Sequence, residues 1–86
     1  MTEELGAEHR DTLGHIFARP SSGNVEWRRV LSLLEAVGTV TERHNGKIEV
    51  TVGGETEVFD RPRAKDVDEQ MLVDVRRMLA AAGLAP

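Results

Sequence analysis

The sequence predicts an α+β domain in the order α-β-β-β-α, in which two helices cover one face of a three-stranded antiparallel sheet. Two segments, residues 24–38 and 66–84, carry apolar residues at helical spacing. Between them, short segments with alternating polar and apolar residues are separated by turns that contain glycine. The 86 residues are expected to form one such domain, residues 24–86, after an N-terminal extension of residues 1–23.

The N-terminal extension is expected to contribute a short strap. Residues 1 to about 10 are polar and unpatterned, and are therefore predicted to be frayed. Leu13, Ile16 and Phe17 then fall at i, i+3, i+4 spacing, which predicts one short helical turn laid against the body of the domain.

The first helix of the domain is predicted to begin at Asn24, because asparagine is a favourable N-cap residue. Glu26 would then lie in the first turn, where the helix dipole favours a negative charge. Gly38 is expected at the C′ position, just past the end of the helix. The expected buried stripe consists of Trp27, Val30, Leu31, Leu34 and Val37.

The turn between the first two strands can close in two registers. A two-residue turn would pair His44 with Lys47, whereas a three-residue loop would pair Arg43 with Lys47. Because a slip of one residue exchanges the two faces of a strand, the apolar pattern decides between them. The three-residue loop puts Gly46 in a left-handed position and leaves His44 exposed in the turn. It also places four apolar residues on one face: Val40, Ile48, Val50 and Val52.

The pair Gly53-Gly54 is predicted to turn the chain into a third strand near Glu55 to Asp60. Val58 and Phe59 are consecutive in this strand, so they must point to opposite faces. The pattern leaves open which of the two faces the helices.

The last helix is predicted to begin with Asp66 as its N-cap, followed by Glu69 in a capping-box arrangement. Gly83 is expected to end this helix, with Leu84 making the apolar contact that accompanies a Schellman motif. The apolar stripe of the helix consists of Val67, Met71, Leu72, Val75, Met78, Leu79 and Ala82.

The composition of the chain argues against disulfides, metal sites and membrane spans. With no cysteine there are no disulfides and no thiolate metal sites, and His9 and His15 do not have zinc-ligand spacing. No metal or cofactor is therefore expected. No apolar stretch approaches the length of a membrane span, and Met1-Thr2-Glu3-Glu4 lacks the features of a signal peptide, so a cytoplasmic protein is expected.

The net charge of −4 argues against a general nucleic-acid binder. Between Thr39 and Lys65, however, acids and bases balance, and the bases gather at the turns. The sheet face away from the helices is expected to be polar and of mixed charge, with Thr39, Thr41, Arg43, Lys47, Glu49 and Thr51.

Several segments between Asn24 and Leu84 together resemble one known family. They are the helix Val30–Gly38, the turn Arg43-His44-Asn45-Gly46-Lys47, the strand end Phe59-Asp60-Arg61-Pro62, the stretch Lys65-Asp66-Val67 and the helix Val75–Leu84. In order and spacing they are similar to the HicA family, the toxin half of HicA–HicB toxin–antitoxin pairs. The resemblance implies a fold like that of double-stranded-RNA-binding domains.

HicA proteins cleave messenger RNA with a histidine that follows a Gly-Ser pair early in the second strand. The matching stretch here is Gly46-Lys47-Ile48, with lysine for the serine and isoleucine for the histidine. The resemblance therefore implies a small RNA-binding domain of the toxin–antitoxin type without ribonuclease activity. Its implied partners are structured RNA and a HicB-like antitoxin, with no membrane. The residues expected to bind RNA are Arg43, His44, Lys47, Arg61, Arg63 and Lys65.

Two alternatives stay open. In the first, His44 acts as the general base of an active endoribonuclease, since it lies beside Arg43 and Lys47. In the second, the domain is a non-enzymatic protein–protein interaction module that forms a dimer through a strand edge or the polar face of the sheet.

Overall fold

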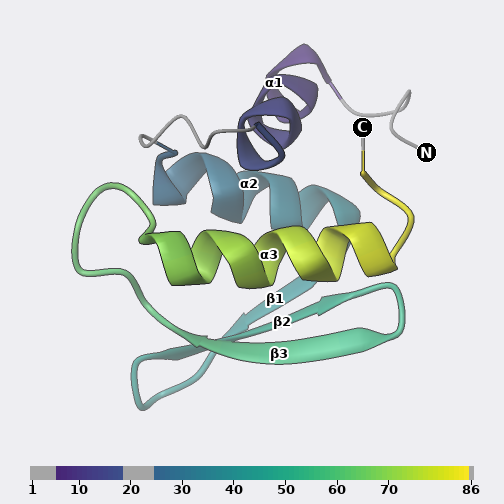
Figure 1. Cartoon of the computed structure of the whole chain (residues 1–86). Coiled ribbons are helices and arrows are strands. Elements are labelled where there is room, and N and C mark those ends of the chain that lie inside the picture. The colour runs from purple at the N-terminus through teal and green to yellow at the C-terminus, as the bar shows by residue number, and fades with distance from the viewer. Residues whose placement is uncertain (1–5, 19–24, 86) are drawn as a thin grey trace.

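The computed structural model describes residues 6–18 and 25–85. Its helices and strands are α1 (Ala7–Ile16), α2 (Trp27–Val37), β1 (Thr39–Glu42), β2 (Lys47–Val52), β3 (Glu55–Asp60) and α3 (Glu69–Ala81). The strands form one antiparallel sheet in the order β1-β2-β3. Figure 1 shows α2 and α3 side by side on one face of this sheet. The predicted α+β class and antiparallel sheet are confirmed.

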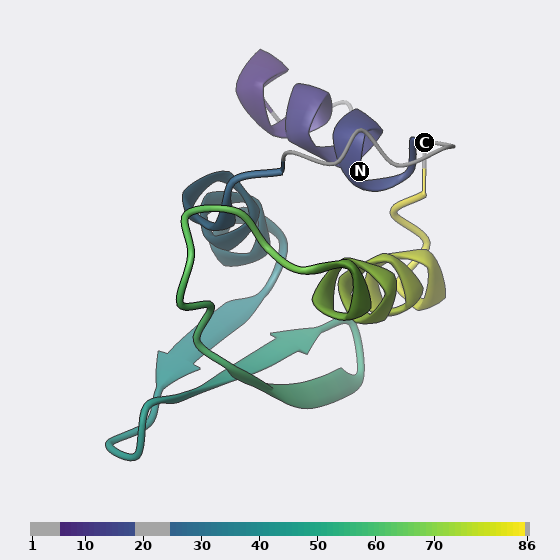
Figure 2. The same cartoon turned by 60° about the vertical axis from the view of Figure 1, so that its left-hand side comes forward.

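The predicted order α-β-β-β-α is wrong, because the N-terminal extension contains a complete helix, which makes the order α-α-β-β-β-α. Residues 7–10, predicted to be frayed, belong to α1. Figure 2 shows α1 lying across α2 and α3 on the side away from the sheet, so the domain has three layers. The predicted boundary between residues 23 and 24 lies outside the described residues.

Tertiary contacts hold α1 in place. Its buried residues are Thr12, Leu13 and Ile16, which share one side of the helix. The Arg76 Nε of α3 donates a hydrogen bond of 2.9 Å to the carbonyl oxygen of Ile16, at the C-terminal end of α1. A helix of this length is marginal by itself in water, so packing against α2 and α3 accounts for its formation.

The N-cap residue of α2 is Glu26, two residues later than the predicted cap, and the helix itself begins at Trp27. Glu26 is therefore not a first-turn residue. The predicted cap, Asn24, lies outside the described residues. The backbone of Glu26 is extended because it forms an antiparallel bridge with Asp66. Backbone hydrogen bonds flank this bridge, from Trp27 N–H to the Lys65 oxygen (2.8 Å) and from Val67 N–H to the Val25 oxygen (3.0 Å).

The buried face of α2 is wider than the predicted stripe. Val30, Leu33 and Leu34 are buried, while Trp27 and Leu31 are only partly covered. The predicted stripe follows one face of the helix at i, i+3, i+4 spacing and does not include Leu33. α1 packs against a second side of α2, away from the sheet, which widens the buried face beyond the predicted stripe.

The first hairpin has the predicted three-residue register. Val40 lies opposite Val50, and Arg43 N–H donates to the Lys47 oxygen at 2.8 Å. Gly46 has φ +83° and donates to the Arg43 oxygen, as a turn closed by a left-handed glycine requires. The register is therefore confirmed.

The choice between Val58 and Phe59 is settled by β3. Phe59 lies opposite Ile48 and is buried, at 7% exposure. Val58 lies opposite Glu49 on the outer face and is 52% exposed. The outer face also carries the polar residues predicted for it.

Gly38 is the C-cap residue of α2 with an extended backbone, and not the left-handed C′ residue predicted from the sequence. A steric constraint, and not the backbone conformation, explains why this position is a glycine. A Cβ atom built at this position would lie 2.1 Å from the backbone oxygen of Thr51, so β2 passes too close for any side chain.

The N-cap of α3 is Asp68, whose Oδ1 accepts a 2.7 Å hydrogen bond from Met71 N–H, so the predicted cap Asp66 is wrong. Val67 consequently precedes the helix instead of lying in its stripe. The C-terminal prediction is confirmed: Leu84 N–H donates to the Leu79 oxygen at 2.9 Å, and Leu84 is buried.

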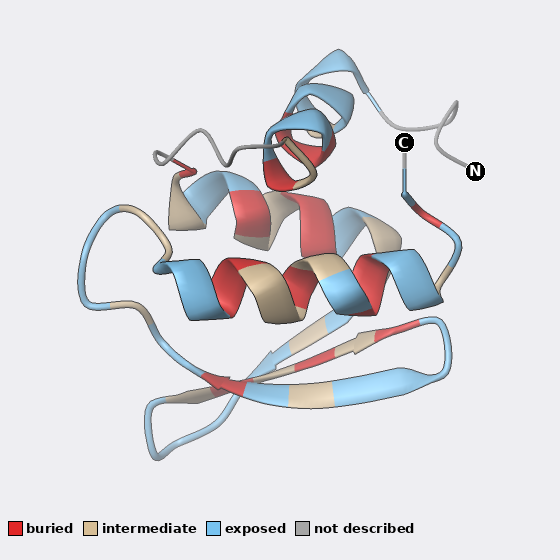
Figure 3. Cartoon of the chain, viewed as in Figure 1, coloured by how far each residue is buried: buried red, intermediate tan, exposed pale blue. Residues whose placement is uncertain are grey.

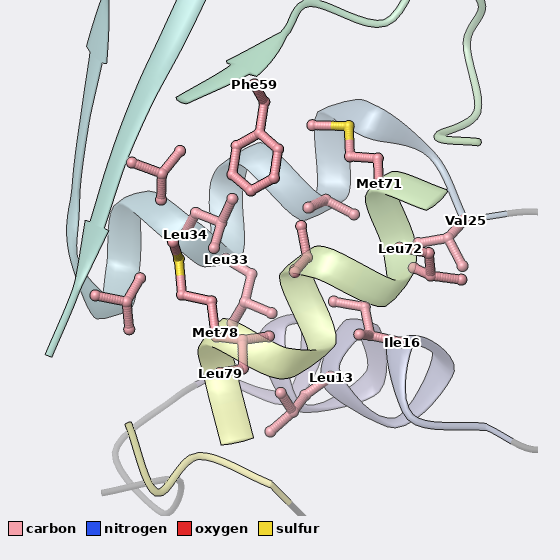
Figure 4. Packing of buried hydrophobic residues seen from close by; sticks show 14 of the residues in the cluster. Leu13, Ile16, Val25, Leu33, Leu34, Phe59, Met71, Leu72, Met78 and Leu79 are labelled. Atoms are coloured by element: carbon pink, nitrogen blue, oxygen red, sulfur yellow. The ribbon is translucent and has the colours of Figure 1, made fainter. Parts of the chain in front are cut away.

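The core fills the space between the sheet and the three helices. In Figure 3 the stretches coloured as buried occur on all three helices and on the sheet. Figure 4 shows Phe59 entering this cluster from the sheet, and Leu13 and Ile16 entering it from α1. Among the described residues, no helix is both long and apolar enough to cross a membrane.

Candidate nucleic-acid interface

The topology brings the predicted binding segments to one end of the sheet. β1 ends at Glu42, β2 begins at Lys47 and β3 ends at Asp60, and these three ends lie together because the strands are antiparallel. The β1–β2 turn (residues 43–46) and the β3–α3 connection (residues 61–68) therefore both leave the sheet at this end, on the left of Figure 1.

Two of the predicted bases are paired with acids on the outer face of the sheet. The Nζ of Lys47 lies 2.5 Å from Oδ1 of Asp60, its partner across β2 and β3. The Nη1 of Arg43 lies 2.5 Å from Oε1 of Glu49. All four side chains keep substantial contact with solvent, so these are surface ion pairs.

Two more bases, both in the β3–α3 connection, are also paired. Arg61 forms an ion pair with Glu42, which joins the start of the connection to the end of β1. The Nζ of Lys65 lies 3.8 Å from Oε2 of Glu26, at the start of α2. The connection is thus held against β1 and α2 by charge as well as by the backbone bridge at Asp66.

His44 and Arg63 are exposed, and neither side chain forms an ion pair or a hydrogen bond within residues 6–18 and 25–85. His44 therefore has no described neighbour that fixes a tautomer or orients the ring toward a reacting group. General base catalysis needs such positioning. Arg63, by contrast, has its five N–H donors available for a ligand.

The β3–α3 connection and α3 enclose a cavity of about 350 Å³, lined by residues 60–64 with Asp66, Asp68 and Met71. Arg61 and Arg63 give it donors for an anion, whereas its three aspartates oppose one. Across the described ranges, no group of three or more histidine or acidic side chains is placed to hold a metal ion.

Acids at this end of the sheet match the bases closely. Surface ion pairs contribute only about 0–1 kcal/mol each, so a phosphate can replace a carboxylate at small cost. The released carboxylate stays nearby, however, and repels the same phosphate. This arrangement suits weak, salt-sensitive phosphate contact better than tight binding.

The acidic partners are the site residues that sequence reasoning missed. For Lys47 and Asp60 a signal existed, because a two-residue Gly53-Gly54 turn places these two residues opposite each other. The pair of Arg61 with Glu42 joins segments that only the folded chain brings together.

Comparison with protein-family models, with curated proteins and with solved structures found no match to this chain.

Proposed function

We propose that this protein is a HicA-like RNA-binding domain without ribonuclease activity, of the toxin–antitoxin type. The β1–β2 turn and the β3–α3 connection would contact phosphates of structured RNA. The observation that supports this proposal most is the meeting of these two segments at one end of the sheet, since the five bases predicted for binding then lie along one edge of the domain. From α2 onward, the elements follow the α-β-β-β-α order that the HicA resemblance implies.

The absence of ribonuclease activity is supported by Ile48. The resemblance expects the catalytic histidine at this position, which in this chain is only 3% exposed and faces the helices. The position thus contributes to the core and presents no acid–base group to a substrate. His44 lies across the turn and lacks an orienting partner among the described residues, which disfavours the alternative that it replaces the missing histidine.

Binding through these contacts should depend strongly on salt. Each phosphate neutralised by a lysine or arginine releases condensed counterions, so affinity falls steeply as the salt concentration rises. Because four of the five bases must also exchange a carboxylate for a phosphate, the affinity should be modest even at low salt.

A pair of charge-matched double variants tests the proposal. Arg61→Ala/Arg63→Ala removes two proposed contacts, whereas Arg10→Ala/Arg77→Ala removes the same charge from exposed positions on α1 and α3. Affinity for a labelled RNA hairpin is measured by fluorescence anisotropy at several salt concentrations. We expect the first variant to lose at least about tenfold in affinity and to show a shallower salt slope. The second should stay within about twofold of wild type, since non-specific attraction alone changes there.

Equal losses in the two variants would mean that only overall charge matters, and the proposed interface would then be wrong. RNA turnover by the wild-type protein that disappears in His44→Ala would contradict the proposed lack of ribonuclease activity.

A non-enzymatic protein–protein interaction module is the second candidate. The pairing of bases with acids favours it, because a surface neutralised in this way attracts polyanions weakly. A HicB-like antitoxin is the partner that the resemblance implies. Salt-insensitive association with such a protein, together with no RNA affinity, would favour this candidate over the first.

A further inference from the structure

We infer that β1 and the adjacent side of α2 pair with a second copy of the chain, which makes a twofold-symmetric dimer with one continuous sheet. This inference does not rest on the proposed RNA binding, because it uses the edge of β1 and the side of α2 opposite α1. The two surfaces share one residue, Arg61, which lines the groove beside β1.

The edge of β1 is open for pairing. Arg43 and Lys47 form a hydrogen-bonded pair, so the alternation of an antiparallel ladder makes Thr41 and Thr39 face β2 as well. The N–H and C=O groups of Val40 and Glu42 therefore point away from the sheet. β1 contains no proline or lysine, which commonly protect such edges.

The opposite edge is much less suited to self-association. β3 has the sequence Glu-Thr-Glu-Val-Phe-Asp, and two copies of it would bring acidic side chains into opposition. β1 has the sequence Thr-Val-Thr-Glu, with a single acid at its end. Of the two edges, β1 is the one whose charge permits pairing with itself.

A groove of about 220 Å³, whose lining includes the charged residues Glu35, Glu42 and Arg61, lies beside this edge, between α2 and β1. Its apolar lining comes from Trp27, Leu31, Val40 and Ile48. Trp27, Leu31 and Val40 are only partly covered by the rest of the chain. A second copy added at β1 would cover this groove with its own α2, because α2 lies on the same sheet face in both copies.

The charges on this side of α2 suit a twofold axis. Glu35 lines the groove four residues after Leu31, and Arg28 precedes Leu31 by three, so both charges flank Leu31 on the exposed side of the helix. If two α2 helices run antiparallel with Leu31 near the axis, Arg28 of each copy lies close to the partner's Glu35. Within the described part of the chain, neither residue forms an ion pair.

The strands fit the same axis. An antiparallel pair of β1 strands centred on Thr41 sets Val40 opposite the partner's Glu42, and both residues direct their free backbone groups outward. Leu31 and Val40 line one groove, so the axes required by the helices and by the strands lie near each other. This agreement favours a second copy over an unrelated occupant.

A charge swap tests this dimer. The single variants Arg28→Glu and Glu35→Arg each place like charges across the axis, whereas the double variant Arg28→Glu/Glu35→Arg restores opposite charges. Sedimentation equilibrium of the full chain is measured between about 1 µM and about 1 mM, where weak complexes dissociate. We expect a mass that rises from 9.5 kDa toward twice that value in wild type.

Each single variant should raise the dimer dissociation constant at least about tenfold, and the double variant should return it to within about threefold of wild type. Val58→Lys, on the outer sheet face, serves as a control that leaves the dimer unchanged. Circular dichroism checks that every variant is folded. A monomeric wild type over the whole range would overturn the inference, and so would a double variant as weak as the singles. A dimer whose dissociation constant is the same in the single variants as in wild type would show that the two copies associate through another surface, and would also overturn the inference.

Discussion

Phe59 and Val58 are neighbours in β3, and the pleat of the strand gives them opposite environments. Phe59 projects into the cluster between the sheet and the helices, while Val58 stands on the outer face beside Glu49. From the sequence, either of these two apolar residues could be the one that packs against the helices. The register of the second hairpin decides between them, because it pairs Phe59 with the buried Ile48.

Truncating these two residues should therefore have very different costs. We expect Phe59→Ala to lower the free energy of unfolding by about 3–5 kcal/mol, since it removes a buried ring and leaves a cavity. Val58→Ala should lower it by less than about 1 kcal/mol, because the side chain is half exposed. Urea unfolding followed by circular dichroism measures both values. Similar losses for the two variants would mean that the described faces of β3 are wrong.

Gly38 is required because β2 leaves no room for a side chain, and not because of its backbone conformation. We expect Gly38→Ala to destabilise the fold by about 1–3 kcal/mol or more, because its Cβ would collide with the Thr51 oxygen and push β2 away. Gly54→Ala is the matched control, since nothing lies within 4 Å of a Cβ at that position. The free energies of unfolding from urea titrations compare them, and a neutral Gly38→Ala would contradict the close packing of β2 on this residue.

At the scale of elements, α1 is the largest difference between sequence and structure. Its apolar residues are few, and Gly14 interrupts the pattern, so the periodicity indicated only one turn. Contacts with α2 and α3, together with the hydrogen bond from Arg76, supply the stabilisation that the local sequence lacks.

If α1 is a complete helix, Gly14→Ala should stabilise the protein by about 1 kcal/mol, because alanine loses less backbone entropy than glycine in a helix. Gly14 is exposed, and a Cβ there would meet no atom within 4 Å. Thermal unfolding measures the effect, with Leu13→Ala as the companion variant that should destabilise by about 2–5 kcal/mol. A destabilising Gly14→Ala would mean that this residue is not helical.

The start of α3 gives a second test at this scale. Asp68→Ala should cost about 0.5–2 kcal/mol, since it removes the side-chain acceptor for the Met71 N–H. Asp66→Ala should cost less, because Asp66 is paired with Glu26 through its backbone. Urea unfolding measures the free energy of unfolding of both variants. A larger loss of stability for Asp66→Ala than for Asp68→Ala would indicate that Asp66 is the N-cap residue, as the sequence predicted.

The elements that the sequence predicts well are those specified locally. The first hairpin follows from the alternation of valines with a left-handed Gly46, and the end of α3 follows from Gly83 and Leu84. The start of α2 could not be predicted, because it depends on the bridge between Glu26 and Asp66, which are distant in sequence. The candidate site is similar: the bases gather at the turns as expected, but their acidic partners come from other segments.

At the scale of the whole molecule, a third layer enlarges the core. A small domain buries a smaller fraction of its surface than a large one, so each additional buried residue matters. Leu13 and Ile16 extend the core beyond α2 and α3, which leaves the outer face of the sheet and its basic end accessible.

The distribution of charge is the other property of the whole molecule. The net charge of −4 and the pairing of most bases at the candidate interface limit long-range attraction of RNA. Binding should therefore be local, with contacts at the β1–β2 turn and the β3–α3 connection.

An amide NMR titration of the folded protein with a short RNA hairpin, at low and at moderate salt, tests whether RNA binds at this end of the sheet. We expect chemical-shift changes confined to residues 43–47 and 61–65, which fade as salt is added, and no signals from cleaved RNA. Shifts spread evenly over the surface, or a spectrum that does not change at low salt, would contradict RNA binding at this end of the sheet.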